Sequence, residues 1–193
     1  PLLEKDLEKY NQIDLYNRIE IPLLKTLALM ENEGINLDVK FLDKLSEKTK
    51  TEVNDLAEKI YKEAGAEFNI SSPKQLGEIL FDQMKISKNP KKTKTGQYST
   101  SEEVLSELAK ENSFVKLILE YRSISKLLNT YIDSLPKQIS SRTNRIHTQY
   151  IQTVASTGRL SSINPNLQNI PIRTNRGREI RKAFIPKNKD YFI

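Results

Sequence analysis

The segment from residue 42 to residue 60 carries the strongest structural signal in this sequence. Its apolar seam recurs at alternating spacings of three and four residues, and consists of Leu42, Leu45, Thr49, Val53, Leu56 and Ile60. Such a narrow stripe, flanked by charged residues, lies along one face of an α-helix and is buried when a second helix packs on it. The seam therefore predicts a long helix, capped by Asp38 and ended by Gly65, that pairs with another helix.

Two other runs have a helical period and are candidate partners. Ile13–Glu33 is predicted to be a helix that stops at Gly34, and we expect Pro22 to kink or divide it. Its inward face would consist of Ile19, Leu23, Leu27 and Met30. Ser113–Leu135 is predicted to be a third long helix, stopped by Pro136.

Two capping boxes predict short helices between the long ones. Ser72 is followed at the third helical position by Gln75, and Thr100 by Glu103. In a capping box the first hydroxyl accepts a hydrogen bond from the amide of the third helical residue, whose side chain reaches back to the cap. Between the two boxes, residues 85–97 form a loop with five lysines and no acidic residue, and it is either a solvated turn or a surface for a polyanion.

The sequence changes character after residue 136. Arg145–Thr153 is rich in β-formers and predicts a strand, whereas residues 155–175 are a loop rich in Gly, Ser, Asn and Pro. A short helix is predicted over Gly177–Phe184, and Asp190–Ile193 looks like the first residues of a strand, so we expect a piece of a longer protein. The predicted fold is mainly α, built on long antiparallel helices with a small β portion, and α+β overall.

Basic residues are concentrated in the last third of the chain. Residues 1–135 hold 20 Lys and Arg against 23 Asp and Glu, whereas residues 136–189 hold 11 against Glu179 alone. This asymmetry predicts a polyanionic partner for the last third. A solvated tail is the alternative, but the apolar residues between the charges disfavour it.

Two absences exclude whole classes of protein. The chain has no cysteine, which excludes disulfides and thiolate metal sites. It also has no run of roughly 20 apolar residues, so we expect no membrane partner. The absence of cysteine also fits a reducing, intracellular location, and we expect the cytoplasm. The single histidine, His147, has no visible catalytic partner and is interpreted as a packed strand residue.

Residues 156–173 read STGRLSSINPNLQNIPIR, in which nearly every polar residue is small or carries an amide. Such a loop can approach another backbone closely and offers several neutral donors, with Arg159 as the cation at its centre. From the residue types alone, the loop suits a polar ligand that accepts hydrogen bonds.

The run TGRLSSINPNLQNIPIR, with GREIRKAF at residues 177–184, closely resembles the first palm motif of family A DNA polymerases, the family of bacterial DNA polymerase I. Upstream, FNISSPKQL (68–76), STSEEVL (99–105) and LEYR (119–122) resemble thumb motifs of that family, in the same order. The resemblance covers roughly residues 15–193. It implies a helical thumb at residues 15–136 and the truncated start of the palm at 137–193. Residues 1–14 would be a linker or the end of an exonuclease-like domain.

The resemblance also implies DNA contacts at particular side chains. In the thumb, it implies contacts to the DNA backbone, which carry no sequence information, at Asn69, Ser71, Ser72, Arg122 and Lys126. Arg159 would reach into the minor groove at the primer-terminal base pair, where every correct pair presents acceptors. Asn166 and Gln168 would lie in the same groove, and Arg173 would line the cleft through a phosphate contact or an ion pair.

The resemblance implies an enzyme, a DNA-directed DNA polymerase, of which this chain is one part. The Mg²⁺-binding carboxylates and the site for deoxynucleotides would lie farther along the parent, so no catalytic or metal-binding residue is assigned to this chain, and we expect it to be inactive alone. The expected partner is primer–template DNA, in a bacterial, nucleoid-associated monomer. Two alternatives stay open: a stand-alone nucleic-acid-binding helical module, and a helical interaction domain whose 42–60 seam binds a partner helix.

Overall fold

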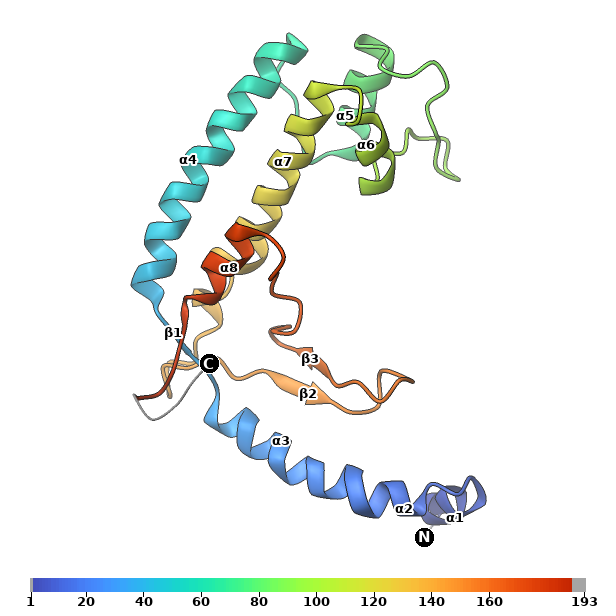
Figure 1. Cartoon of the computed structure of the whole chain (residues 1–193), viewed down its shortest axis with the longest axis vertical. Coiled ribbons are helices and arrows are strands. Elements are labelled where there is room, and N and C mark those ends of the chain that lie inside the picture. Colours follow the sequence, from blue (N-terminus) through green and yellow to red (C-terminus); the bar gives the residue numbers. More distant parts are fainter. Residues whose placement is uncertain (1, 189–193) are drawn as a thin grey trace. The chain divides into compact units, whose positions relative to one another are not determined.

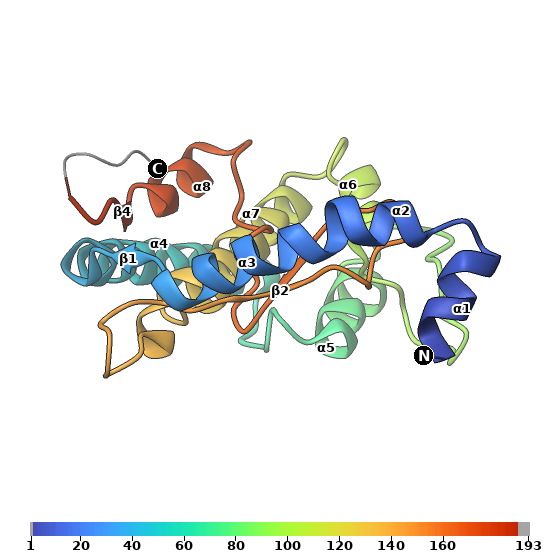
Figure 2. The same cartoon turned by 90° about the horizontal axis from the view of Figure 1, so that it is seen from below.

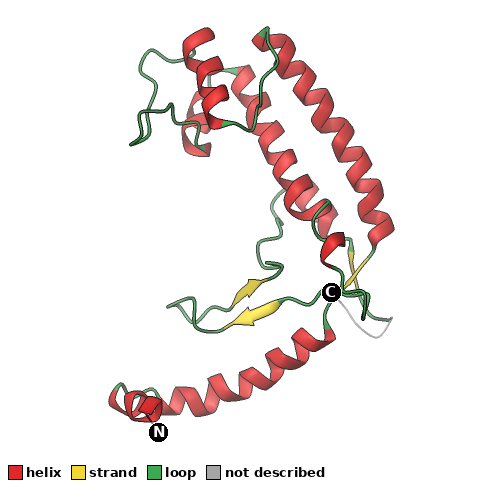
Figure 3. Ribbon diagram, turned by 180° about the vertical axis from the view of Figure 1, so that it is seen from behind, coloured by secondary structure: helices red, strands yellow, loops and turns green. Residues whose placement is uncertain are grey.

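The computed structural model describes residues 2–188, which divide into two compact units (Figure 1). Residues 43–133 form one unit, here called the helical unit. Residues 2–42 and 134–188 form the other, here called the discontinuous unit because two separate stretches of chain build it. Helices dominate and strands are few and short (Figure 3), so the predicted α+β class is confirmed.

The helical unit holds most of α4 (Val39–Ala64) and the helices that follow it. These are α5 (Pro73–Gly77), the π-helical turn η2 (Glu78–Gln83), α6 (Glu102–Leu108), α7 (Ser113–Leu127) and the π-helical turn η3 (Leu128–Ile132). Their main core is a cluster of buried residues: Ile60, Ile70, Leu76, Ile79, Leu80, Phe81, Leu105, Ala109, Phe114, Val115 and Ile118. Since Ile60 of α4 packs in one core with Phe114 and Ile118 of α7, the long helices pack together as the seam predicts.

The predicted limits of α4 are confirmed. The Asp38 carboxylate accepts a hydrogen bond from the Phe41 amide at 2.9 Å, and Gly65 ends the helix with a φ of +72°. In the seam, Leu42, Thr49, Leu56 and Ile60 are buried. The third long helix ends at Ile132, before the predicted stop at Pro136, which instead begins a short 3-10 turn, η4 (Pro136–Gln138).

The two capping boxes differ from their predicted form. Ser72 does cap α5, accepting from the Gln75 amide at 3.4 Å, but the Gln75 side chain bonds the Asn69 amide at 2.6 Å. In the second box the cap is Ser101, one residue later than predicted, because the Thr100 side chain is buried and used elsewhere.

A buried polar contact joins α4 to the turn after α7, and the sequence analysis missed it. The Ser46 hydroxyl, 7% exposed, donates to the Asp133 carboxylate at 2.6 Å. The second carboxylate oxygen of Asp133 lies 3.1 Å from the ammonium of Lys50. Residues 87 positions apart are therefore tied together by a short, charge-assisted hydrogen bond.

The discontinuous unit begins with α1 (Leu2–Lys9), α2 (Ile13–Leu15), the π-helical turn η1 (Tyr16–Glu20), α3 (Ile21–Glu33) and β1 (Asn36–Leu37). It continues with η4, β2 (Gln149–Ile151), β3 (Ser161–Ile163), α8 (Asn175–Arg181) and β4 (Phe184–Ile185). β1 pairs with β4 and β2 pairs with β3, both antiparallel, and β2 lies against α3 (Figure 2).

Several predictions for this unit need correction. The predicted strand over Arg145–Thr153 shrinks to β2, with Ile146 forming a single bridge to Ile35. β3 lies inside the segment predicted to be a loop, and α8 ends at Arg181, where the predicted helix runs to Phe184. The predicted strand at Asp190–Ile193 lies outside the described residues.

The face predicted for the helix over Ile13–Glu33 is largely solvent-exposed. Leu27 is buried, but Ile19 is 53% and Met30 is 50% exposed. Pro22 does not break the run, because residues 13–33 stay helical and only change from the π-helical turn η1 to α3 just before it. The sequence therefore predicts the helix correctly. Of the four residues of its predicted inward face, however, only Leu27 is buried in the described part of the chain.

The structure groups residues 15–42 with 134–188, whereas the sequence analysis places them with the helical region. The backbone of Ile35 exchanges two hydrogen bonds with that of Ile146, at 2.8 and 2.9 Å. The Asp38 amide donates to the Ala183 carbonyl at 2.8 Å. These bonds to distant residues decide the grouping, and the names thumb and palm for the units stay predictions.

Replacement of Asp133 tests the buried polar contact. We expect Asp133→Ala to lower the free energy of unfolding by about 2 kcal/mol, because it leaves the buried Ser46 hydroxyl without its acceptor. Asp133→Asn retains an acceptor oxygen and loses mainly the more exposed ion pair to Lys50, so its effect should stay below about 1 kcal/mol. Urea unfolding followed by circular dichroism measures both.

Asp55→Ala is the matched control, since Asp55 is an exposed aspartate on α4 and should change stability by less than about 0.5 kcal/mol. Equal effects of Asp133→Ala and Asp55→Ala would contradict the role given to Asp133.

Candidate nucleic-acid interface

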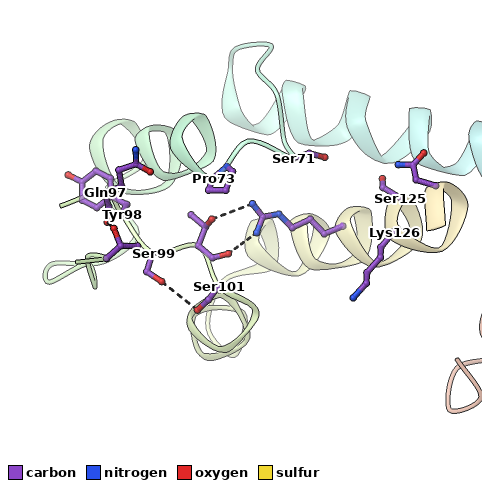
Figure 4. Close-up of a pocket in the computed structure, with 12 residues that line it drawn as sticks. Ser71, Pro73, Gln97, Tyr98, Ser99, Ser101, Ser125 and Lys126 are labelled. Atoms are coloured by element: carbon purple, nitrogen blue, oxygen red, sulfur yellow. Dashed lines mark hydrogen bonds between the residues drawn. The ribbon is translucent and has the colours of Figure 1, made fainter. Parts of the chain in front are cut away.

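A hollow of about 510 Å³ in the helical unit gathers three of the predicted DNA contacts, Ser71, Arg122 and Lys126 (Figure 4). Seven of its twelve lining residues carry hydroxyl groups: Ser71, Thr93, Tyr98, Ser99, Thr100, Ser101 and Ser125. Gln97 and Asn129 add amides, and none of the twelve is acidic. A wall of neutral donors with two cations suits an anion that accepts hydrogen bonds, such as a phosphate.

Arg122 of α7 is tied into the wall of this hollow. Its guanidinium donates to the Thr100 carbonyl at 2.7 Å and to the Thr100 hydroxyl at 3.4 Å. Burial lowers the pKa of Arg122, although an arginine stays protonated at neutral pH. Arg122 thus holds the extended segment that leads into α6, and it also lines the hollow.

Two buried polar atoms of the hollow make no hydrogen bond with the described residues. They are the Nε of Arg122 and the hydroxyl of Ser125, both on α7. Buried polar groups are nearly always paired with protein or with water, so these atoms indicate a place where a polar ligand or water belongs. Lys126 follows Ser125, is exposed, and lies about one helical turn beyond Arg122.

The turn that carries Ser71 is built by its neighbours. The Asn69 side-chain oxygen accepts from the Ser71 amide at 3.0 Å, and the Asn69 carbonyl accepts from the Ser72 amide at 2.9 Å. Ser72 also caps α5 through Gln75. Asn69 and Ser72 therefore shape the turn, and Ser71 presents its exposed hydroxyl at the hollow.

The lysine loop at residues 85–97 ends at one edge of this hollow and folds as a tight turn. The Thr93 amide donates to the Gln97 carbonyl at 2.7 Å, and the Tyr98 hydroxyl donates to Asp82 at 2.6 Å. That bond to Asp82, together with partial burial, raises the pKa of Tyr98. Gly77 leaves room for Tyr98, since a Cβ at Gly77 would lie 2.8 Å from the Tyr98 Cβ.

The other predicted contacts lie in the discontinuous unit and have exposed side chains. Arg159 lies between β2 and β3, directly after Gly158, which has a φ of +74°. Asn166 folds its side-chain oxygen back to the amides of Gln168 and Asn169, at 3.0 and 3.2 Å. Arg173 precedes Thr174, which caps α8.

His147 has structural contacts, as predicted, but it is half-buried and lies two residues before β2, not in a strand. One ring nitrogen lies 2.7 Å from the Glu31 carbonyl and the other lies 2.6 Å from the Thr143 hydroxyl. Because a carbonyl can only accept, the nitrogen facing Glu31 carries a proton. Both ring nitrogens are thus used in fixing the chain beside α3.

Thr93, Ser99 and Asn129 also line the hollow, and none of them is predicted from the sequence as a DNA contact. The sequence carries part of the signal, because the Ser99–Ser101 run contains three consecutive hydroxyls. This run predicts a helix cap and resembles a thumb motif, but nothing local in the sequence indicates that α7 packs opposite it.

Neither a metal site nor a membrane span is found in the described part of the chain. Among residues 2–188, no group of three or more His, Asp or Glu side chains could hold a metal ion. The residues present therefore do not fit the Mg²⁺ site of a polymerase. None of the described helices is long and apolar enough to cross a bilayer.

Comparison with known proteins gives one consistent family. The family model described as DNA polymerase family A matches residues 39–193. DNA polymerase I of Synechocystis sp. is 46% identical over 193 residues, covering 99% of this chain and 19% of that protein. DNA polymerase I of Bacillus subtilis is 46% identical over 191 residues, covering 99% of this chain and 22% of that protein.

A solved structure agrees with these sequence matches. The POL domain of Pol1 from M. smegmatis, in complex with DNA primer-template and dNTP, superposes with a TM-score of 0.86 at 42% identity. The match covers 95% of this chain and 32% of that one. The chain thus spans about a fifth of the length of the curated relatives described above.

Substitution of Arg122 separates its structural bonds from its charge. We expect Arg122→Ala to lower the free energy of unfolding by about 2 kcal/mol, since it removes two hydrogen bonds from a charged donor to Thr100. Arg122→Lys keeps the charge but loses the two-pronged geometry, so we expect about half that loss. Urea unfolding is the measurement, with Lys116→Ala on the exposed surface of α7 as control. A loss in Arg122→Ala no larger than in the control would show that the bonds to Thr100 contribute nothing.

Proposed function

The chain belongs to DNA polymerase family A, and we propose that it is the DNA-binding thumb and the first part of the palm of a template-directed DNA polymerase. The observation that carries the proposal is the hollow of the helical unit, where seven hydroxyls and two cations converge without an acidic residue. The polymerase in the M. smegmatis structure is bound to primer-template DNA, and the same ligand is proposed for this chain.

In this proposal the helical unit is the thumb and binds the DNA backbone. Ser71 and Lys126 would contact phosphate oxygens directly. Arg122, which is held by Thr100, would act through its charge and its Nε, while Asn69 and Ser72 would hold Ser71 in place. Contacts of this kind bind any sequence, as a polymerase must. The lysine loop would add further positive charge beside the same duplex.

The discontinuous unit would read the end of the primer. Arg159 is exposed on the β2–β3 hairpin, and its guanidinium can donate to purine N3 and pyrimidine O2 in the minor groove. Those acceptors are present in every correct base pair, so an arginine there tests pairing geometry and ignores sequence. Asn166 and Gln168 offer amide donors to the same groove, and Arg173 would contact a phosphate or support the cleft.

The chemistry of nucleotidyl transfer belongs, in this proposal, to other parts of the parent enzyme. Mg²⁺ would be bound by carboxylates outside this chain, together with the deoxynucleotide. The residues described here would bind and orient the primer–template, and the chain alone would be inactive. We propose that the parent acts as a monomer in DNA replication and repair.

Loss of Arg159 tests the groove contact. We expect Arg159→Ala to weaken binding of a primer–template with a recessed 3′ end by about tenfold, and to weaken binding of blunt duplex much less. Arg142→Ala is the matched control, because Arg142 is also an exposed arginine of the same unit and its loss changes the charge equally. Fluorescence anisotropy of labelled DNA measures both. Equal losses in the two variants would mean that Arg159 acts only through its charge.

The backbone contact is tested by salt dependence. Affinity of the chain for duplex should fall steeply as salt rises, because phosphates are neutralised and counterions are released. We expect Lys126→Ala to reduce the slope of log affinity against log salt by about one, whereas Lys116→Ala on the same helix leaves it nearly unchanged. No binding of the unaltered chain at low salt would contradict the proposal that these two units alone hold DNA.

A further inference from the structure

Two buried hydroxyls, those of Thr148 and Ser162, lie behind the turn that presents Asn166 and Gln168. Thr148 is 4% exposed and Ser162 is fully buried, and their oxygen atoms are 2.6 Å apart. The hydroxyl of Thr148 also lies 3.0 Å from the Ile163 carbonyl and 2.8 Å from the Pro165 carbonyl. The Ser162 hydroxyl accepts from the Leu167 amide at 3.1 Å and lies 3.2 Å from the Pro165 carbonyl.

These contacts form one series of hydrogen bonds, because each hydroxyl can donate only once. Each hydroxyl has a single proton to donate, and the Leu167 amide must donate to Ser162. The shortest contacts are all used when Ser162 donates to Thr148 and Thr148 donates to the Pro165 carbonyl; in the other order Thr148 donates to Ser162, and Ser162 donates to the Pro165 carbonyl. In both orders the relay runs from the amide of residue 167 through Ser162 to the carbonyl of residue 165, with Thr148 bonded to Ser162.

This relay closes the turn from the inside. It bonds backbone groups on both sides of Asn166, whose own side-chain oxygen holds the Gln168 amide. It also links the turn to the strand region, because Thr148 directly precedes β2 and Ser162 lies within β3 opposite Tyr150. The exposed side chains of Asn166 and Gln168 thus start from a backbone that is held at three points.

We propose that Thr148 and Ser162 are positioning residues that set the geometry of Asn166 and Gln168 for the minor groove at the primer end. Their burial keeps them from touching DNA themselves, so they act only through the turn. The inference rests on the proposed function, since it takes the groove contacts of Asn166 and Gln168 as its premise.

An ordinary core role makes a different prediction from a positioning role. Two buried hydroxyls that serve only packing could be replaced by apolar groups of the same shape at little cost. A pair that fixes the turn would, when the Ser162 hydroxyl is removed, release the Leu167 amide and let Gln168 leave its place. The helical unit would keep its fold, because its core cluster contains neither residue.

Ser162→Ala is the decisive variant, because it removes the hydroxyl that accepts from the Leu167 amide. We expect amide hydrogen exchange at Leu167 to become about tenfold faster in the full chain. We expect the preference for recessed primer–template over blunt duplex to fall as far as in Gln168→Ala. Thr148→Val leaves Ser162 in place to accept from Leu167 and should have a smaller effect, and Thr153→Val, at an exposed threonine of the same hairpin, should change neither readout.

The outcomes separate the two proposals. Unchanged exchange at Leu167 in Ser162→Ala would overturn the positioning role, as would a retained preference for recessed ends in that variant while Gln168→Ala loses it. If neither Arg159→Ala nor Gln168→Ala alters that preference, the proposed groove contacts are wrong. The exchange rates of Thr148→Val and Ser162→Ala then still decide whether the hydroxyl pair holds the turn.

Discussion

The discontinuous unit depends on the backbone hydrogen bonds of residues 35–38. Ile35 bonds Ile146 in both directions, β1 pairs with β4, and the Asp38 amide bonds the Ala183 carbonyl. A stretch of four residues thereby joins segments more than a hundred positions apart. Because unpaired backbone groups are costly when buried, this short stretch has few other ways to be satisfied. The carboxylate of Glu33 adds to the junction, and the hydrogen bond and charge of Lys187, then Arg145, lower its pKa.

Long-range polar bonds give the two units their detailed form. Ser46 with Asp133, Thr100 with Arg122 and Thr148 with Ser162 each join residues on different elements. Each bond satisfies a buried hydroxyl that would lower stability if it had no partner. Each bond also orients a segment, either near a candidate DNA contact or near the N-terminal end of α4. In this chain the apolar cores hold the helices together, while polar pairs decide how the irregular segments lie.

The sequence predicts features that depend on residues close together along the chain. It does not predict features that depend on a partner far away in the sequence. The period of residues 42–60, the Asp38 cap and the Gly65 stop are local, and each was found in its predicted place. β1 and β3 are two and three residues long, too short for a period-2 pattern to appear, so their pairing could not be read. The sequence predicts that Thr100 is a helix cap, and only the structure shows that Arg122 bonds it. The exposure of Ile19 and Met30 shows that a helical period predicts which residues share one face of a helix, but not whether another element covers that face.

The division into two units matters for how DNA would be recognised. Hydroxyls and cations of the helical unit can satisfy phosphate oxygens of any sequence, and their affinity is set by charge and salt. Arg159, Asn166 and Gln168 instead carry planar donor groups suited to acceptors at fixed positions in the minor groove, so their contribution depends on geometry. Affinity tolerates small shifts of a flexible lysine such as Lys126, whereas a planar donor that is displaced by about 1 Å loses its bond. If the proposed groove contacts hold, this difference gives a reason for the buried hydroxyl pair of Thr148 and Ser162 behind the turn at residues 163–168.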